Sequence, residues 1–140
     1  MPTFVVTATA GRLSADKKAA IANALVTIHS TENGVPRWCV QVIFHEISAG
    51  NHFIGDKFAP ADQLWIHADT RPGRTTEKKT AMIDRMVKEV STAGGVDESY
   101  IWVYVNEISQ IAEFGMHFPP PGMEGAFVAS LPVEVRQRYE

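Results

Sequence analysis

Two stretches of the chain carry apolar residues at the spacing of an amphipathic helix. The apolar stripe of each stretch consists of three residues: Ile21, Leu25 and Ile28 in the first, and Ile83, Val87 and Val90 in the second. The segment that leads into each stretch is also repeated, as Gly-Arg-Leu-Ser at residues 11–14 and Gly-Arg-Thr-Thr at residues 73–76. The pattern therefore predicts two related helices, with Ser14 and either Thr75 or Thr76 as their N-caps.

Segments rich in β-branched and aromatic residues flank each predicted helix. They cover residues 3–9 and 38–46 in the first half, and residues 64–68 and 100–107 in the second. Each half thus reads strand, helix, strand, and a right-handed crossover makes its two strands parallel. We predict an α/β fold in which duplicated β-α-β units form a four-stranded mixed sheet with both helices on one face.

The chain is predicted to be a single domain of two halves, about residues 2–61 and 62–118. After Glu107 the sequence turns to Gly, Pro and Met, and the run Phe-Pro-Pro-Pro-Gly at residues 118–122 continues neither a helix nor a ladder of strands. We expect residues 119–140 to form an extended arm that ends in a short helix, about residues 132–139. Ser130 or Leu131 is the expected cap of that helix, with Pro132 in its first turn.

The second face of the predicted sheet has no helix to cover it. Some of six apolar residues are expected on that face: Val40, Val42, Phe44, Trp65, Trp102 and Tyr104. Since a β-α-β unit of this size buries little apolar surface by itself, the bare face predicts self-association.

Composition and charge exclude several classes of function. The net charge of -3 and the scattered basic residues provide no surface for nucleic acid. The chain has no apolar run long enough to span a membrane and no signal peptide at its start, so we expect a cytoplasmic protein with no membrane partner. The single cysteine, Cys39, lies in an apolar segment, and we interpret it as a buried thiol.

Pro2 is the first candidate for chemistry. Removal of Met1 would leave its secondary amine as the chain terminus, and that amine can act as a base when neutral or as an acid when protonated. Proline at the second position is also common without any role, so Pro2 alone does not decide the function.

Arg71 and Arg74 flank a Pro-Gly turn directly before the second predicted helix. A helix N-terminus favours anions, and a guanidinium group can bind a carboxylate through two parallel hydrogen bonds. The alternative is a solvated loop. Three further candidates are His29, where the helix dipole favours a cationic imidazole, Tyr104 on the last strand, and Glu113 in an apolar loop. The remaining histidines lack zinc-ligand spacing and no cofactor motif is present, so we expect no metal and no cofactor.

Pro2, the arginine pair and the duplicated units together resemble the cis-3-chloroacrylic acid dehalogenase group of the tautomerase superfamily. The resemblance runs from Pro2 to about Tyr139 and includes the strings Val-Gln-Val at residues 40–42, Ile-Trp-Val-Tyr at 101–104 and Leu-Pro at 131–132. It implies a tautomerase fold, also called MIF-like, in a homotrimer with active sites near the subunit boundaries.

The resemblance also implies roles for individual residues. Pro2 matches the catalytic proline, Arg71 and Arg74 match arginines that bind the substrate carboxylate, and His29 matches a histidine that assists them. Tyr104 and Glu113 match the pair that positions and activates water. The loop at residues 109–112 is one residue shorter than the family pattern, which affects the placement of Glu113.

Three functions follow from this interpretation. The first is Pro2-dependent keto-enol tautomerisation or hydration of a small unsaturated or 2-oxo carboxylate. The second is hydrolytic dehalogenation of a cis-3-haloacrylate to malonate semialdehyde. The third, from another class, is a non-catalytic structural or cytokine-like trimer.

Overall fold

Four strands of equal length form the centre of the molecule. The computed structural model describes residues 1–140. Its main sheet has the order β2-β1-β5-β6, with β1 at Thr3–Thr9, β2 at Gln41–Ile47, β5 at Leu64–Thr70 and β6 at Ile101–Glu107. β1 pairs with β2 and β5 with β6 in parallel, whereas the central pair β1 and β5 is antiparallel. The predicted mixed sheet of two β-α-β units is confirmed.

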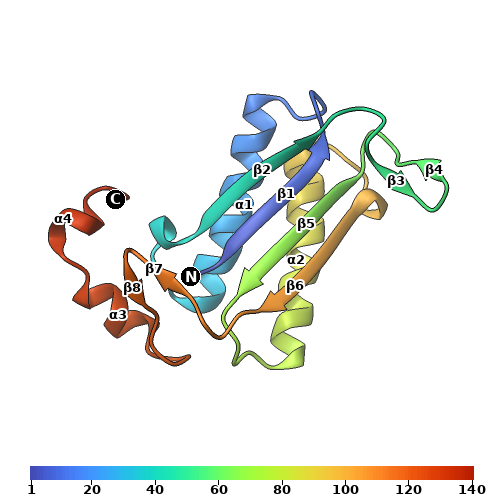
Figure 1. Cartoon of the computed structure of the whole chain (residues 1–140). Helices are drawn as coiled ribbons and strands as arrows, with labels where there is room; N and C mark the ends of the chain where they lie inside the picture. The colour runs from blue at the N-terminus through green and yellow to red at the C-terminus, as the bar shows by residue number, and fades with distance from the viewer.

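Two helices cover one face of this sheet, as predicted (Figure 1). They are α1 (Ala15–Asn33) and α2 (Thr76–Gly94). Ser14 caps α1 by accepting a hydrogen bond from the backbone N–H of Lys17, and Thr75 caps α2 in the same way from Lys78. Both helices end at a glycine in the left-handed conformation, which side chains rarely adopt.

The core lies between the helices and the sheet. Alternate residues of the central strands point toward the helices, and Phe4, Val6, Leu64 and Ile66 have no exposed surface. The stripe predicted on α1 is buried, but the buried stripe of α2 is Met82, Met86 and Val90. Of the stripe predicted on α2, Val90 is buried and Val87 is partly buried against the core, whereas Ile83 is only partly buried and lies outside the core cluster. Met82 and Ile83 are neighbours, as are Met86 and Val87, and in each pair the packing against the sheet buries the methionine more deeply.

The other sheet face is open, and it holds half of the six residues expected there. Trp65, Trp102 and Tyr104 lie on it, with Trp102 41% and Tyr104 52% exposed. Val40, Val42 and Phe44 pack against the core on the helix side instead. A short 3-10 turn at Arg37–Cys39 occupies the first residues of the predicted strand, so β2 begins only at Gln41.

Two small hairpins were not predicted. The first pairs β3 (Phe53–Ile54) with β4 (Lys57–Phe58), and the second pairs β7 (Ala112–Glu113) with β8 (Met116–His117). They lie at opposite ends of the main sheet (Figure 1). Each follows the last main strand of its half, so the duplication extends beyond strand, helix and strand. Strands of two residues are too short to leave a periodic pattern in the sequence.

The C-terminal arm contains more helix than expected. Residues 119–123 are irregular, but α3 (Glu124–Ser130) follows them and buries Phe127 against the ring of Phe118. The terminal helix α4 is only Val133–Arg136, and Pro132 rather than Ser130 or Leu131 occupies its N-cap position. The arm folds back beside β7 and β8, near the amino terminus of the chain (Figure 1).

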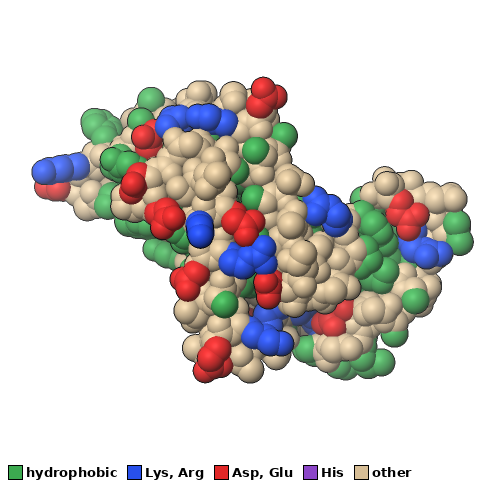
Figure 2. Space-filling view, turned by 180° about the vertical axis from the view of Figure 1, so that it is seen from behind, with side chains coloured by type: hydrophobic (Ala, Val, Ile, Leu, Met, Phe, Trp, Pro, Cys, Tyr) green, Lys and Arg blue, Asp and Glu red, His purple; other side chains and the backbone are tan.

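Charges of both signs are spread over the helical face of the molecule, without a large patch of one sign (Figure 2). Cys39 is buried, as predicted, and burial raises the pKa of its thiol to about 12. None of the helices combines the length and hydropathy required to cross a membrane.

Candidate active site

Two cavities meet at the amino terminus of the chain. The first, of about 540 Å³, is lined by Pro2, His29, Arg71, Arg74 and Glu124 among others. The second, of about 570 Å³, is lined mainly by apolar side chains together with Glu113. Met1 and Pro2 line both cavities, and Met1 is buried between them. Loss of Met1 would therefore open a path between the two cavities at Pro2.

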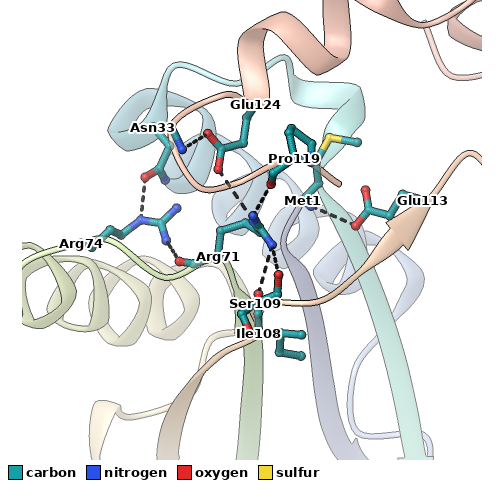
Figure 3. Close-up of polar contacts among 10 residues, drawn as sticks. Met1, Asn33, Arg71, Arg74, Ile108, Ser109, Glu113, Pro119 and Glu124 are labelled. Carbon is teal, nitrogen blue, oxygen red and sulfur yellow. Dashed lines mark hydrogen bonds and ion pairs between the residues drawn. The ribbon is translucent and has the colours of Figure 1, made fainter. Parts of the chain in front are cut away.

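The side chain of Arg71 is held in place by backbone carbonyls (Figure 3). Arg71 follows directly after β5 and is only 5% exposed. Its Nη1 donates to the carbonyl of Ser109 at 2.6 Å, and its Nη2 donates to that of Pro119 at 2.5 Å. Its Nε is buried without a hydrogen-bond partner. Two of the three guanidinium nitrogens thus donate hydrogen bonds to backbone carbonyls, whereas the buried Nε donates none.

Arg74 lies one turn further along the same loop and is also fixed by the protein. Its Nε donates to Asn33 Oδ1 and its Nη1 donates to the carbonyl of Arg71, both at 2.7 Å (Figure 3). No hydrogen bond is formed by its Nη2. Partial burial is the main cause that lowers its pKa from the ordinary value, and nearby Glu124 acts in the opposite direction. Asn33, which sequence reasoning missed, ends α1 and so links this arginine to the first helix.

His29 is neutral, contrary to the cationic imidazole expected from its helix position. It is 2% exposed in the last part of α1, and burial, followed by the charge of Arg74, lowers its pKa to about 3. Desolvation therefore outweighs the helix dipole. His29 Nδ1 is buried without a partner. The residue adds polarity but no charge to the arginine-lined cavity.

Glu113 lies on strand β7 rather than in a loop, and it contacts the chain terminus. Its Oε1 is 2.9 Å from the amino nitrogen of Met1 (Figure 3). The following residue, Phe114, has a φ of 54°, which is uncommon for a residue other than glycine. Its ring packs edge-on against Trp38 and Tyr139. These contacts fix the tight turn and with it the position of the Glu113 carboxylate.

Tyr104 is the one predicted site residue that lies elsewhere. It projects from the middle of β6 on the open sheet face, where its ring packs against Trp65. It lines a separate, smaller cavity and neither of the two that contain Pro2. The other five predicted site residues, Pro2, His29, Arg71, Arg74 and Glu113, gather around the amino terminus.

Comparison with known proteins identifies the family. Residues 1–127 match the model of a family described as putative oxalocrotonate tautomerase enzymes. The chain is also similar to the crystal structure of N1, a member of the cis-3-chloroacrylic acid dehalogenase family. The two share 35% identity over 98% of this chain and 97% of that one, with a TM-score of 0.90. The chain belongs to the tautomerase superfamily, in its cis-3-chloroacrylic acid dehalogenase group.

Other solved structures share the tautomerase fold. Pt0534, whose structure shows it inactivated by 2-oxo-3-pentynoate, is 26% identical over 81% of this chain and 93% of its own, with a TM-score of 0.73. A fused 4-OT in a symmetric trimer is 23% identical over 81% of this chain and 93% of its own, also at 0.73. No curated protein sequence matched.

Glu124 is a second residue of the arginine-lined cavity that sequence reasoning missed. It begins α3 in the C-terminal arm, and its Oε1 lies 3.8 Å from Arg71 Nε. Its Oε2 accepts a hydrogen bond from the backbone N–H of Gly122 at 2.8 Å. A glutamate in a proline-rich arm gives no local signal of such a contact, which exists only because the arm folds back.

The arrangement around Pro2 suits the chemistry of a small anion. The arginine-lined cavity supplies positive charge, and the adjoining cavity supplies a carboxylate near the chain terminus. No group of three or more His, Cys, Asp or Glu side chains is placed to hold a metal ion.

Proposed function

We propose that this chain is an enzyme in which the secondary amine of Pro2, exposed by removal of Met1, catalyses keto-enol tautomerisation or hydration of a small unsaturated or 2-oxo carboxylate. The observation that carries the proposal is the position of Pro2 between the arginine-lined cavity and the cavity that contains Glu113. Membership of the tautomerase superfamily supports it.

In the tautomerisation, Arg74 and Arg71 attract the substrate carboxylate into the first cavity. Arg74 supplies the accessible donors, because its Nη2 forms no hydrogen bond within the protein, whereas the almost fully buried Arg71 contributes mainly its positive charge. The neutral amine of Pro2 takes the proton from the enol oxygen. The same proton is then returned to the substrate at carbon, which gives the 2-oxo acid and regenerates the amine.

Hydrolytic dehalogenation of a cis-3-haloacrylate is the second candidate. The position of Glu113 favours it, since its carboxylate contacts the amine of Met1, the residue next to Pro2. A nearby carboxylate stabilises a protonated amine, and it can also accept a proton from water. The water molecule that has given its proton to Glu113 would add its oxygen to the β-carbon, while the cationic amine of Pro2 protonates the α-carbon. Loss of halide and a proton from the resulting halohydrin gives malonate semialdehyde.

We also propose that the working unit is a homotrimer, which the open sheet face and the trimeric fold relatives support. In such an assembly Tyr104 of the partner subunit would complete the site near Pro2. This would account for the distance of Tyr104 from the site within one chain.

Two variants separate the two reactions. Pro2→Ala should lose both activities, since it replaces the ring-held secondary amine of proline with the primary amine of a flexible terminus. Glu113→Gln should retain ketonisation of an enol such as phenylenolpyruvate but lose turnover of cis-3-chloroacrylate. Full activity of Pro2→Ala would refute proline catalysis, and a processed wild-type protein without activity toward either substrate would favour the non-catalytic trimer.

A further inference from the structure

The arginine-lined cavity contains a carboxylate of its own. Glu124 lines it together with Arg71 and Arg74, and its side chain is 22% exposed. Its Oε1 faces Arg71 Nε at 3.8 Å, beyond hydrogen-bond distance. Arg71 Nε is the buried donor that has no partner. Glu124 thus places a negative charge beside Arg71 in the cavity that an incoming carboxylate would enter.

The net positive charge of the side chains in this cavity is small. Two guanidinium groups contribute two positive charges, Glu124 contributes one negative charge, and His29 contributes none. The net charge of these four residues is therefore equivalent to a single cation. One substrate carboxylate neutralises it, whereas a second would meet the repulsion of Glu124 without a free cation to offset it.

Glu124 is also held independently of any substrate. Its second oxygen, Oε2, accepts the Gly122 N–H at 2.8 Å, and its backbone begins α3. The carboxylate is therefore fixed in the cavity by the turn at residues 120–123. It cannot leave without breaking that contact.

We propose that Glu124 is a specificity-determining residue that restricts the site to monocarboxylates and disfavours dicarboxylates. This inference rests on the proposed function, because it concerns the same cavity. It adds a class of ligand: an unsaturated acid with one carboxylate and an uncharged remainder. The uncharged remainder is directed toward the second, mainly apolar cavity beyond Pro2.

Equilibrium binding tests the proposal without requiring turnover. Crotonate and fumarate are probes of equal chain length that differ in a methyl group and a second carboxylate. Their dissociation constants can be measured by NMR titration with protein that lacks Met1. We expect the wild type to bind crotonate more tightly than fumarate. Glu124→Gln keeps an oxygen for the Gly122 N–H but removes the charge, and it should raise the affinity for crotonate by roughly fivefold.

The affinity of the Gln variant for fumarate should rise by more than its affinity for crotonate. The ratio of the two dissociation constants, fumarate over crotonate, should therefore fall by at least about threefold relative to the wild type. Glu124→Asp should keep the wild-type ratio, and Glu134→Gln, an exposed change in the same arm, should alter neither affinity. Glu124→Ala is a second neutral variant that should narrow the ratio in the same way if the Gln variant does not fold.

The proposal is overturned if the neutral variants leave the ratio unchanged, or if they weaken both ligands equally, as a purely structural role would. Failure of the catalytic proposal has a different signature. Absence of turnover in the wild type would leave the selectivity between crotonate and fumarate intact, whereas failure of this proposal would leave turnover intact and abolish the dependence on Glu124.

Discussion

At the scale of single residues, burial decides what the site can do. His29 and Arg71 are the most buried polar side chains of the arginine-lined cavity, and neither behaves as its residue type alone suggests. The imidazole is neutral because it is desolvated, and the guanidinium is largely occupied by backbone carbonyls. The sequence identified these residue types, but solvent exposure depends on the arm that folds over them.

His29 should make the folded protein sensitive to acid. The unfolded chain protonates this residue below its ordinary pKa of 6.5, whereas the folded chain keeps it neutral down to about pH 3. Its contribution to stability is therefore complete above pH 6.5 and is lost as the pH falls toward 3. The difference in unfolding free energy between wild type and His29→Leu should decrease by about 2–3 kcal/mol between pH 6.5 and 4.5.

Urea denaturation across this pH range measures that difference. His117→Gln, at an exposed histidine, is the matched control and should show no comparable slope relative to the wild type. A pH-independent difference for His29→Leu would mean that the imidazole is solvated or paired in the folded state.

At the scale of elements, Arg71 connects three segments that are distant in the sequence. It extends from the end of β5 to the segment between β6 and β7 and to the start of the arm. Arg74, by contrast, binds only Asn33 at the end of α1 and the neighbouring carbonyl of Arg71. The two arginines, which form a pair in the sequence, therefore differ in how many segments they connect.

Substitution of the two arginines should give different results. Arg71→Ala leaves an empty space at a buried position and removes the donor of partly buried carbonyls, and it should lower the unfolding free energy by about 2–4 kcal/mol. Arg74→Ala should cost less stability and instead raise KM for a carboxylate substrate, by roughly tenfold or more. Chemical denaturation and steady-state kinetics on both variants separate the effects, and equal loss of stability would contradict this division.

Local chemistry explains which elements were predictable. The caps at Ser14 and Thr75 and the alternating strands β1 and β5 follow from neighbouring residues, so the sequence indicated them. The hairpin around Glu113 and the helix that begins at Glu124 follow from contacts with distant segments. Pattern reasoning had no access to those contacts, and the family resemblance supplied Glu113 but not Glu124.

At the scale of the whole molecule, the two halves of the duplication differ at the position of Pro2. The position before β5 that corresponds to Pro2 before β1 is Gln63, which is buried and has no amine. The second half instead contributes the arginines and the open face with Trp102 and Tyr104. The two halves thus contribute different residues to the arginine-lined cavity.

The open face should be covered by self-association into a trimer. Analytical ultracentrifugation should give a mass about three times the 15.4 kDa of one chain. Trp102→Glu places a charge on that face and should shift the protein toward smaller species, whereas Lys88→Glu, exposed on α2, should not. A wild-type monomer at micromolar concentration would contradict the assembly and the sharing of Tyr104.

The central claim is that the free amine of Pro2 performs the chemistry. With Met1 present, the Pro2 nitrogen is an amide and cannot accept a proton, and the amine that contacts Glu113 belongs to Met1. The most direct measurement is kcat/KM for phenylenolpyruvate on the same protein before and after treatment with methionine aminopeptidase, with intact mass reporting the processed fraction. We predict that activity rises in proportion to that fraction and is lower by at least about 100-fold when Met1 is retained. Equal activity of the two forms would contradict proline catalysis.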